Sequence, residues 1–142
     1  MSVDNKNIVI TSAVRTAIGT FRGSLKDMQA KDLGALVTQT AMQKSNLNPN
    51  DVDELIMGQV LTGGAGQNPA RQASVQAGLP IEKTAYLINQ VCGSGLRSIA
   101  AGYQAIMSND SKVIIAGGQE SMTNAPQAIH FDKGKTLDES NL

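Results

Sequence analysis

The sequence predicts an α/β fold in which a layered, mostly parallel β-sheet carries helices on both faces. Short apolar runs typical of strands alternate along the chain with longer segments whose apolar residues recur at helical spacing. The chain has 142 residues, 41% of them hydrophobic, which is enough for one domain with a real core. It contains 14 glycines and only 3% aromatic residues, so we expect glycine-rich turns and close backbone packing.

Four short apolar runs are the predicted strands, and they cover residues 8–11, 55–60, 84–91 and 112–116. The first run is interpreted as a buried strand. Because each later run follows a segment with helical features, the connections are expected to be right-handed crossovers between parallel strands. Residues 15–26 are predicted to form a loop and residues 63–66 a flexible glycine turn.

Three segments are predicted helices. The first covers residues 31–44, and Lys44 is favourably placed at the negative end of the helix dipole. Asn68-Pro69 is typical of a helix start, and the helix is predicted to run to Ala77, with Gly78 as its left-handed terminator. The pair Asn48-Pro49 has the same signature and predicts a short turn.

The third predicted helix covers residues 94–107. Its larger apolar residues form one stripe: Leu96, Ile99, Ala100, Tyr103, Ile106 and Met107. Many of its other residues are small, so the helix is small and apolar nearly all round, which is typical of a helix packed on several sides. We therefore expect it to lie between two sheets or at a domain or subunit interface, and we expect the chain to be part of a larger structure.

Composition excludes several function classes. Twelve basic and twelve acidic residues give a net charge of zero, which argues against a nucleic-acid partner. One cysteine excludes an internal disulfide framework and a cysteine-based zinc cluster, and no metal site is predicted. The N-terminus is polar, and no apolar stretch approaches the roughly 18 residues that span a bilayer. We expect a soluble, cytoplasmic protein without a membrane partner.

Cys92 is the candidate nucleophile. It stands between a predicted strand that ends at Val91 and a predicted helix that begins at Ser94, so it lies close to a helix N-terminus. Free backbone N–H groups and the helix dipole favour a thiolate there, and the thiolate is the reactive form. Gly93 and Gly95 leave room for a substrate carbonyl and for backbone donors to a developing oxyanion. The spacing alone also permits a buried structural cysteine.

The segment Asn-Gln-Val-Cys-Gly-Ser-Gly-Leu-Arg-Ser around Cys92 resembles the acyl-enzyme cysteine motif of the thiolase family. Other segments resemble thiolases in the same order, and together they cover residues 8–126. They are Ile-Thr-Ser-Ala-Val-Arg-Thr from Ile10, Gly-Gln-Val from Gly58, Gly-Gln-Asn-Pro-Ala-Arg-Gln from Gly66, and Gly-Gly-Gln-Glu-Ser-Met-Thr from Gly117.

The resemblance implies the N-terminal half of a thiolase-like fold, with an α/β domain at residues 1–125 and the start of the following loop region at 126–142. It implies an acyltransferase that condenses two acetyl-CoA molecules into acetoacetyl-CoA and CoA, or runs the reverse thiolysis, through an acyl-thioester on Cys92. Asn89, Gly93, Ser94 and Gly95 would shape the site. Coenzyme A thioesters would be substrates, and no cofactor is implied. The complete subunit would form a homodimer or homotetramer, pairing along the strand at 84–91.

The family's general-base histidine and second cysteine belong to its second half and are not in this chain, so we expect the 142 residues alone to be inactive. His130 is interpreted as a solvated loop residue, and Glu120 as a structural residue near the site that needs partners. Two alternatives stay open: a degradative 3-ketoacyl-CoA thiolase of longer chain preference, and a non-enzymatic half-protein. The latter would be either an inactive truncated product without the second-half acid/base residues or a half-domain that binds a full-length partner.

Overall fold

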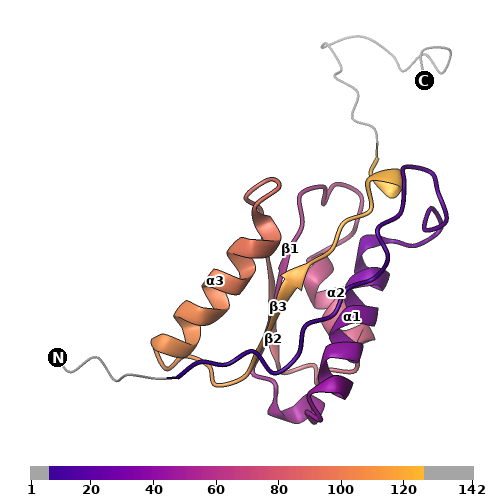
Figure 1. Ribbon diagram of the computed structural model, residues 1–142. Helices are drawn as coiled ribbons and strands as arrows, with labels where there is room; N and C mark the ends of the chain where they lie inside the picture. The colour runs from indigo at the N-terminus through magenta and orange to yellow at the C-terminus, as the bar shows by residue number, and fades with distance from the viewer. Residues whose placement is uncertain (1–6, 127–142) are drawn as a thin grey trace, which may run out of the picture.

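Three parallel strands form the centre of the computed structural model, which describes residues 7–126 (Figure 1). The strands are β1 (Glu54–Gly58), β2 (Thr84–Ile88) and β3 (Ile114–Gly118), in the order β2–β1–β3. In the register, Glu54 of β1 stands opposite Thr84 of β2 and Ile114 of β3. The predicted parallel sheet is confirmed for these strands.

Helices cover both faces of this sheet, as predicted. Helices α1 (Ala30–Lys44) and α2 (Pro69–Gln76) lie on one face, and α3 (Ser94–Met107) lies on the other (Figure 1). Two short 3-10 turns, η1 (Pro49–Asp51) and η2 (Met122–Asn124), complete the described elements. The result is a three-layer α/β arrangement.

The main core fills the space between β1 and the α1–α2 pair. Leu55 and Met57 of β1 are almost completely buried against small residues of the two helices, such as Ala35, Ala70 and Ala73. Ile56, on the other face of β1, is also fully buried. A central parallel strand is covered by helices on both sides, which explains why it reads as a continuous apolar run.

Helix α2 begins and ends as its sequence predicts. Asn68 adopts a left-handed conformation, φ +43°, and its side-chain oxygen accepts a hydrogen bond from the Arg71 N–H. Pro69 occupies the first turn, where its missing N–H costs nothing. Gly78 follows the helix with φ +90°, the conformation that favours glycine at this position.

The predicted strand at residues 8–11 is wrong. The segment is extended but not part of a sheet, and Val9 and Ile10 are 73% and 80% exposed. Within residues 7–126, no backbone hydrogen bond joins it to another strand. An apolar run supplies local strand preference only, and the segment lacks a partner among the described residues to complete a ladder.

The fourth strand is shifted by two residues from its predicted range of 112–116, and it begins at Ile114. The backbone N–H groups of Lys112 and Val113 donate to the Asp53 carboxylate instead, at 2.7 and 3.0 Å. At its other end β3 continues through Gly118, which pairs with the last residue of β1.

Helix α3 turns its small residues toward the sheet and its large apolar residues outward. Ser94, Ser98 and Gly102 are buried, and a β-carbon on Gly102 would lie 3.2 Å from Ile114 Cγ2. Leu96 and Tyr103 are 75% and 54% exposed. Within the described residues α3 therefore packs on one side only, and Leu96, Ile99 and Tyr103 of the predicted apolar stripe lie on its open face.

In the part of the chain that the structure describes, none of the helices has the length and apolar character needed to cross a membrane. His130 lies outside the described residues.

Candidate active site around Cys92

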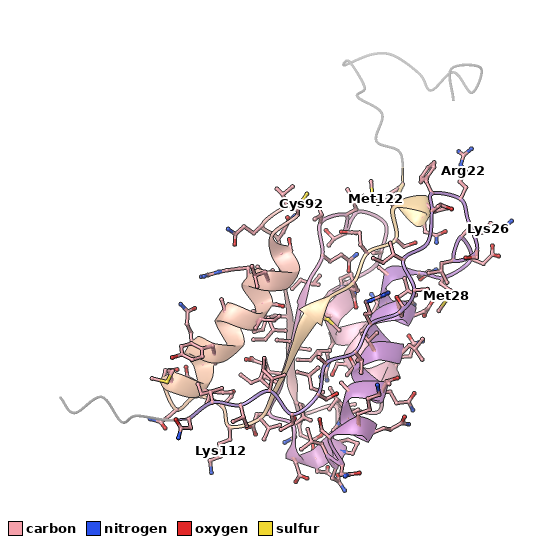
Figure 2. The ribbon with its side chains drawn as sticks, viewed as in Figure 1. Arg22, Lys26, Met28, Cys92, Lys112 and Met122 are labelled. Atoms are coloured by element: carbon pink, nitrogen blue, oxygen red, sulfur yellow. The ribbon has the colours of Figure 1, made fainter. Side chains whose placement is uncertain are left out.

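Cys92 lies at the carboxyl end of the sheet, between the end of β2 and the start of α3 (Figure 2). This confirms the predicted strand-to-helix junction. The side chain is exposed, so the alternative of a buried structural cysteine is wrong. In open parallel sheets, the crevice beyond the carboxyl ends of the strands is the usual place for ligands.

A strained residue immediately precedes the cysteine. Val91 has φ +50°, a left-handed conformation that is rare for a β-branched side chain and costs about 1–3 kcal/mol. This turn ends β2 at Ile88, three residues before the predicted end. The Asn89 side-chain oxygen accepts a hydrogen bond from the Val91 N–H at 3.0 Å and holds the strained peptide in place.

Ser94 closes the same turn from the helix side. Its hydroxyl accepts from the Gln90 N–H at 2.8 Å and donates to the Val91 carbonyl at 2.6 Å. The Ser94 N–H also donates to the Val91 carbonyl, at 3.1 Å. Residues 89–94 thus form a turn closed by hydrogen bonds, which we call the elbow, with Cys92 at its tip. The side chains of Asn89 and Ser94 shape this turn.

The two glycines beside Cys92 have separate structural tasks. The Gly93 N–H donates to the Gln90 carbonyl at 3.0 Å, which closes the elbow. Gly95 packs against the sheet, because a β-carbon on Gly118 would lie 3.3 Å from the Gly95 α-carbon. From the sequence, both glycines were expected to leave room for a substrate carbonyl and for backbone donors to an oxyanion. The structure adds that the missing side chain of Gly118 lets the first turn of α3 approach β3 closely, whereas a β-carbon on Gly95 itself would make only an ordinary contact of 3.8 Å.

Glu120 finds its partners on the segment that leaves β1. Its carboxylate accepts from the Val60 N–H at 2.7 Å and from the Leu61 N–H at 3.3 Å. The Val60 carbonyl in turn accepts from the Asn89 side-chain amide at 3.2 Å. The sequence indicated only that a carboxylate two residues after a pair of glycines at a strand end would need partners.

Two glutamines beneath the site were missed by sequence reasoning. Gln119 Nε2 donates to Gln59 Oε1 at 2.8 Å, and both side chains are buried. Gln119 Oε1 lies against Gly34 of α1, where any side chain would collide with it. Each glutamine follows the last glycine of its strand, and that repeated Gly-Gln pair is the signal that could have found them.

A polar cavity of about 710 Å³ lies at the other end of the sheet, where the strands begin. Its lining includes Asp53, Glu54 and Asp110. Burial, followed by the charges of Asp110 and Asp53, raises the pKa of Glu54. Hydrogen bonds from the Lys112 and Val113 N–H groups lower the pKa of Asp53. These carboxyl groups are far from Cys92, so they do not take part in chemistry at its thiol.

The arrangement can present a nucleophile to a substrate, but it does not contain the whole machinery for a reaction. Cys92 is accessible and stands at the N-terminal end of α3, where the helix dipole favours negative charge. Residues 7–126 contain no histidine, so a general base of that type must come from elsewhere.

Comparisons with known proteins show which family the chain resembles over most of its length. The family described as "Thiolase, N-terminal domain" matches residues 8–141. The acetyl-CoA acetyltransferase of Rhizobium meliloti (strain 1021) is 51% identical over 132 residues, which are 93% of this chain and 34% of that protein. The probable acetyl-CoA acetyltransferase of Escherichia coli (strain K12) is 48% identical over 138 residues, 96% of this chain and 35% of that protein.

A solved structure is similar as well. The crystal structure of Acat5 thiolase from Ascaris suum in complex with coenzyme A has a TM-score of 0.85 and 40% sequence identity. The match covers 90% of this chain and 34% of that one. The chain thus spans about a third of the length of the relatives that it matches.

Proposed function

Because this chain belongs to the thiolase family, we propose that it supplies the nucleophilic part of an acetyl-CoA acetyltransferase, which condenses two acetyl-CoA molecules or runs the reverse thiolysis. The observation that carries the proposal is the exposed Cys92 at the tip of a bonded elbow, directly before α3. The acetyl specificity is supported by the relatives at about half identity, which are named acetyl-CoA acetyltransferases.

In the first step, the Cys92 thiolate attacks the carbonyl carbon of an acyl-CoA thioester. A bond forms between Sγ and that carbon, and the carbon–sulfur bond to coenzyme A breaks. Coenzyme A leaves as a thiolate and takes up a proton. The covalent intermediate divides one difficult acyl transfer into two easier ones.

In the second step, an acetyl-CoA that has lost a proton from its α-carbon attacks the acyl carbonyl. A carbon–carbon bond forms, and the Cys92 thiolate is released. The groups that move these protons are provided by parts of the complete enzyme outside residues 7–126. This chain's own residues bind and orient the sulfur at the helix N-terminus.

A chimera tests the proposal. It joins this chain to the remaining two thirds of the Rhizobium meliloti relative, and acetoacetyl-CoA thiolysis is then assayed. We expect activity that falls to background in the Cys92→Ala variant, with unchanged circular dichroism. Mass spectrometry after incubation with acetyl-CoA should find one acetyl group on Cys92. Full activity of a folded Cys92→Ala chimera would contradict the proposal.

We also propose that complete subunits associate through β2. This strand lies at one side of the described sheet and pairs with β1 only. An edge strand offers unpaired backbone groups to another chain, and a two-fold contact would place the same strand of both subunits side by side. Because Cys92 lies four residues after β2, each nucleophile would lie near that contact.

A further inference from the structure

We propose that Asn89 and Glu120 act together as positioning residues that fix the elbow carrying Cys92. The inference rests on the proposed function, because the direction of the Cys92 thiol matters to catalysis only if that thiol is the nucleophile. Neither side chain needs to touch the substrate. The geometry assigns both of them to the backbone on which the cysteine stands.

Both the oxygen and the nitrogen of the Asn89 side-chain amide form hydrogen bonds. Its oxygen accepts from the Val91 N–H at 3.0 Å, and its nitrogen donates to the Val60 carbonyl at 3.2 Å. The first contact holds Val91 in its left-handed conformation. The second ties the elbow to the segment that leaves β1.

Glu120 fixes that same segment from the opposite side. Val60 donates its N–H to one carboxylate oxygen of Glu120 and accepts the Asn89 amide with its carbonyl. Leu61 donates to the second carboxylate oxygen. A continuous chain of hydrogen bonds therefore runs from Glu120 after β3, through Val60 after β1, to the N–H of Val91, the residue before Cys92.

The consequence for Cys92 follows from the strain at Val91. Without an acceptor for its N–H, Val91 lowers its conformational free energy by returning to a negative φ, because the left-handed region is unfavourable for a β-branched residue. That rotation would move Cys92 away from the first turn of α3. If Glu120 is lost, Val60 is released, and the Asn89 amide loses its fixed anchor.

Asp53 provides a matched comparison at the opposite end of the sheet. Its carboxylate also accepts two consecutive backbone N–H groups across two neighbouring strands, from Lys112 and Val113. Figure 2 shows Lys112 and Cys92 at opposite ends of the molecule. Loss of Asp53 should therefore weaken the sheet to a similar degree without disturbing the elbow.

The experiment measures the rate of Cys92 alkylation by iodoacetamide at fixed pH in the 142-residue chain, with the modified site mapped by mass spectrometry. Thermal unfolding is recorded for each variant. We expect Asn89→Ala and Glu120→Ala each to slow alkylation about two- to fivefold, the range set by the interaction of a charge with a helix end. The double variant should be no slower than the slower single variant, because both act on one chain of bonds.

Two further variants separate positioning from general stability. Asp53→Ala should lower the unfolding temperature and leave the alkylation rate unchanged. Glu120→Gln keeps an acceptor for the Val60 N–H and should recover most of the rate lost in Glu120→Ala. If Glu120→Ala does not fold, Asn89→Ala carries the comparison with Asp53→Ala.

Three results would overturn the inference: a wild-type alkylation rate in Asn89→Ala or in a folded Glu120→Ala, fully additive effects in the double variant, or equal slowing in Asp53→Ala. Failure of the proposed function would look different. In that case acetyl-CoA would leave Cys92 unmodified in the chimera, whatever the alkylation rates of these variants are.

Discussion

Gly58, the last residue of β1, lies so close to α3 that a β-carbon on it would sit 2.4 Å from the backbone nitrogen of Gly95. The Ser94 carbonyl carbon would be even closer, at 2.3 Å. These neighbours are backbone atoms of the first helical turn, so they cannot move aside without moving the helix. The absence of a side chain on Gly58 thus sets how near the helix that follows Cys92 approaches the sheet.

We therefore expect Gly58→Ala to lower the free energy of unfolding by about 3 kcal/mol, the upper part of the usual range for overpacking. It should also reduce Cys92 alkylation, because the first turn of α3 is displaced. Gly117→Ala is the matched control, since its β-carbon would make only an ordinary contact of 3.9 Å with Met57. Urea unfolding of both variants gives the comparison, and equal stability of the two would contradict the packing argument.

Asp53 makes stability depend on pH in the acid range. Its pKa is lowered in the folded chain, chiefly by the Lys112 and Val113 N–H groups, so folding favours its ionised form. This contribution is complete above the unfolded pKa of about 3.9 and is lost as the pH falls through the lower folded value. We expect Asp53→Asn to be less stable than wild type near neutrality and to lose less stability on acidification.

Denaturant unfolding between about pH 5 and about pH 2.5 measures this difference. Asp51→Asn is the control, because the Asp51 side chain is exposed and lies two residues before Asp53. If the free energies of unfolding of wild type and Asp53→Asn change in parallel with pH, the two backbone hydrogen bonds do not favour the ionised form of the Asp53 carboxyl group.

The open face of α3 predicts self-association of the 142-residue chain. Leu96, Ile99 and Tyr103 place large apolar surfaces side by side on the outside of the helix. We expect light scattering to show a mass that rises with concentration, and the variant Leu96→Lys/Tyr103→Lys to reduce this rise. Val75→Lys on α2, at a separate exposed apolar residue, should leave it unchanged. A wild-type chain that stays monomeric and melts cooperatively would contradict the prediction.

The proposed contact along β2 is tested by a charge in that strand. Tyr86→Lys in the chimera places like charges near each other across the two-fold axis, so we expect the mass of the assembly to fall toward that of one subunit, with loss of activity. Ile81→Lys, just before β2 and 76% exposed, is the control. An unchanged, active oligomer in Tyr86→Lys would exclude this contact.

The features that the sequence predicted well depend on neighbours along the chain. The Asn68 cap with Pro69 and the placement of Cys92 before α3 follow from a few consecutive residues. The strand at residues 8–11 failed because a strand also needs a partner, which a local apolar run does not reveal. Periodicity found the apolar stripe of α3, but it does not tell which face of a helix meets the sheet.

The parts of the site that the sequence did not predict join residues about sixty positions apart. Glu120 reaches back to Val60, and Gln119 reaches back to Gln59. Both contacts exist because parallel strands bring their carboxyl ends together. A short sequence motif does not reveal which strand ends are adjacent in the fold. The elbow and its residues Asn89 and Ser94 were located from the sequence, but their hydrogen-bond partners were visible only in three dimensions.

The strand order also has a kinetic consequence. The central strand β1 precedes both of its neighbours in the chain. Its backbone hydrogen bonds are therefore complete only after both β2 and β3 have paired with it. Contacts at such long sequence separation close slowly, because chain entropy is lost before the contact energy is gained. The Glu120–Val60 contact requires β3 to be docked. In refolding, the reactive geometry of Cys92 should therefore be acquired after the helices have formed, in the last phase of the reaction.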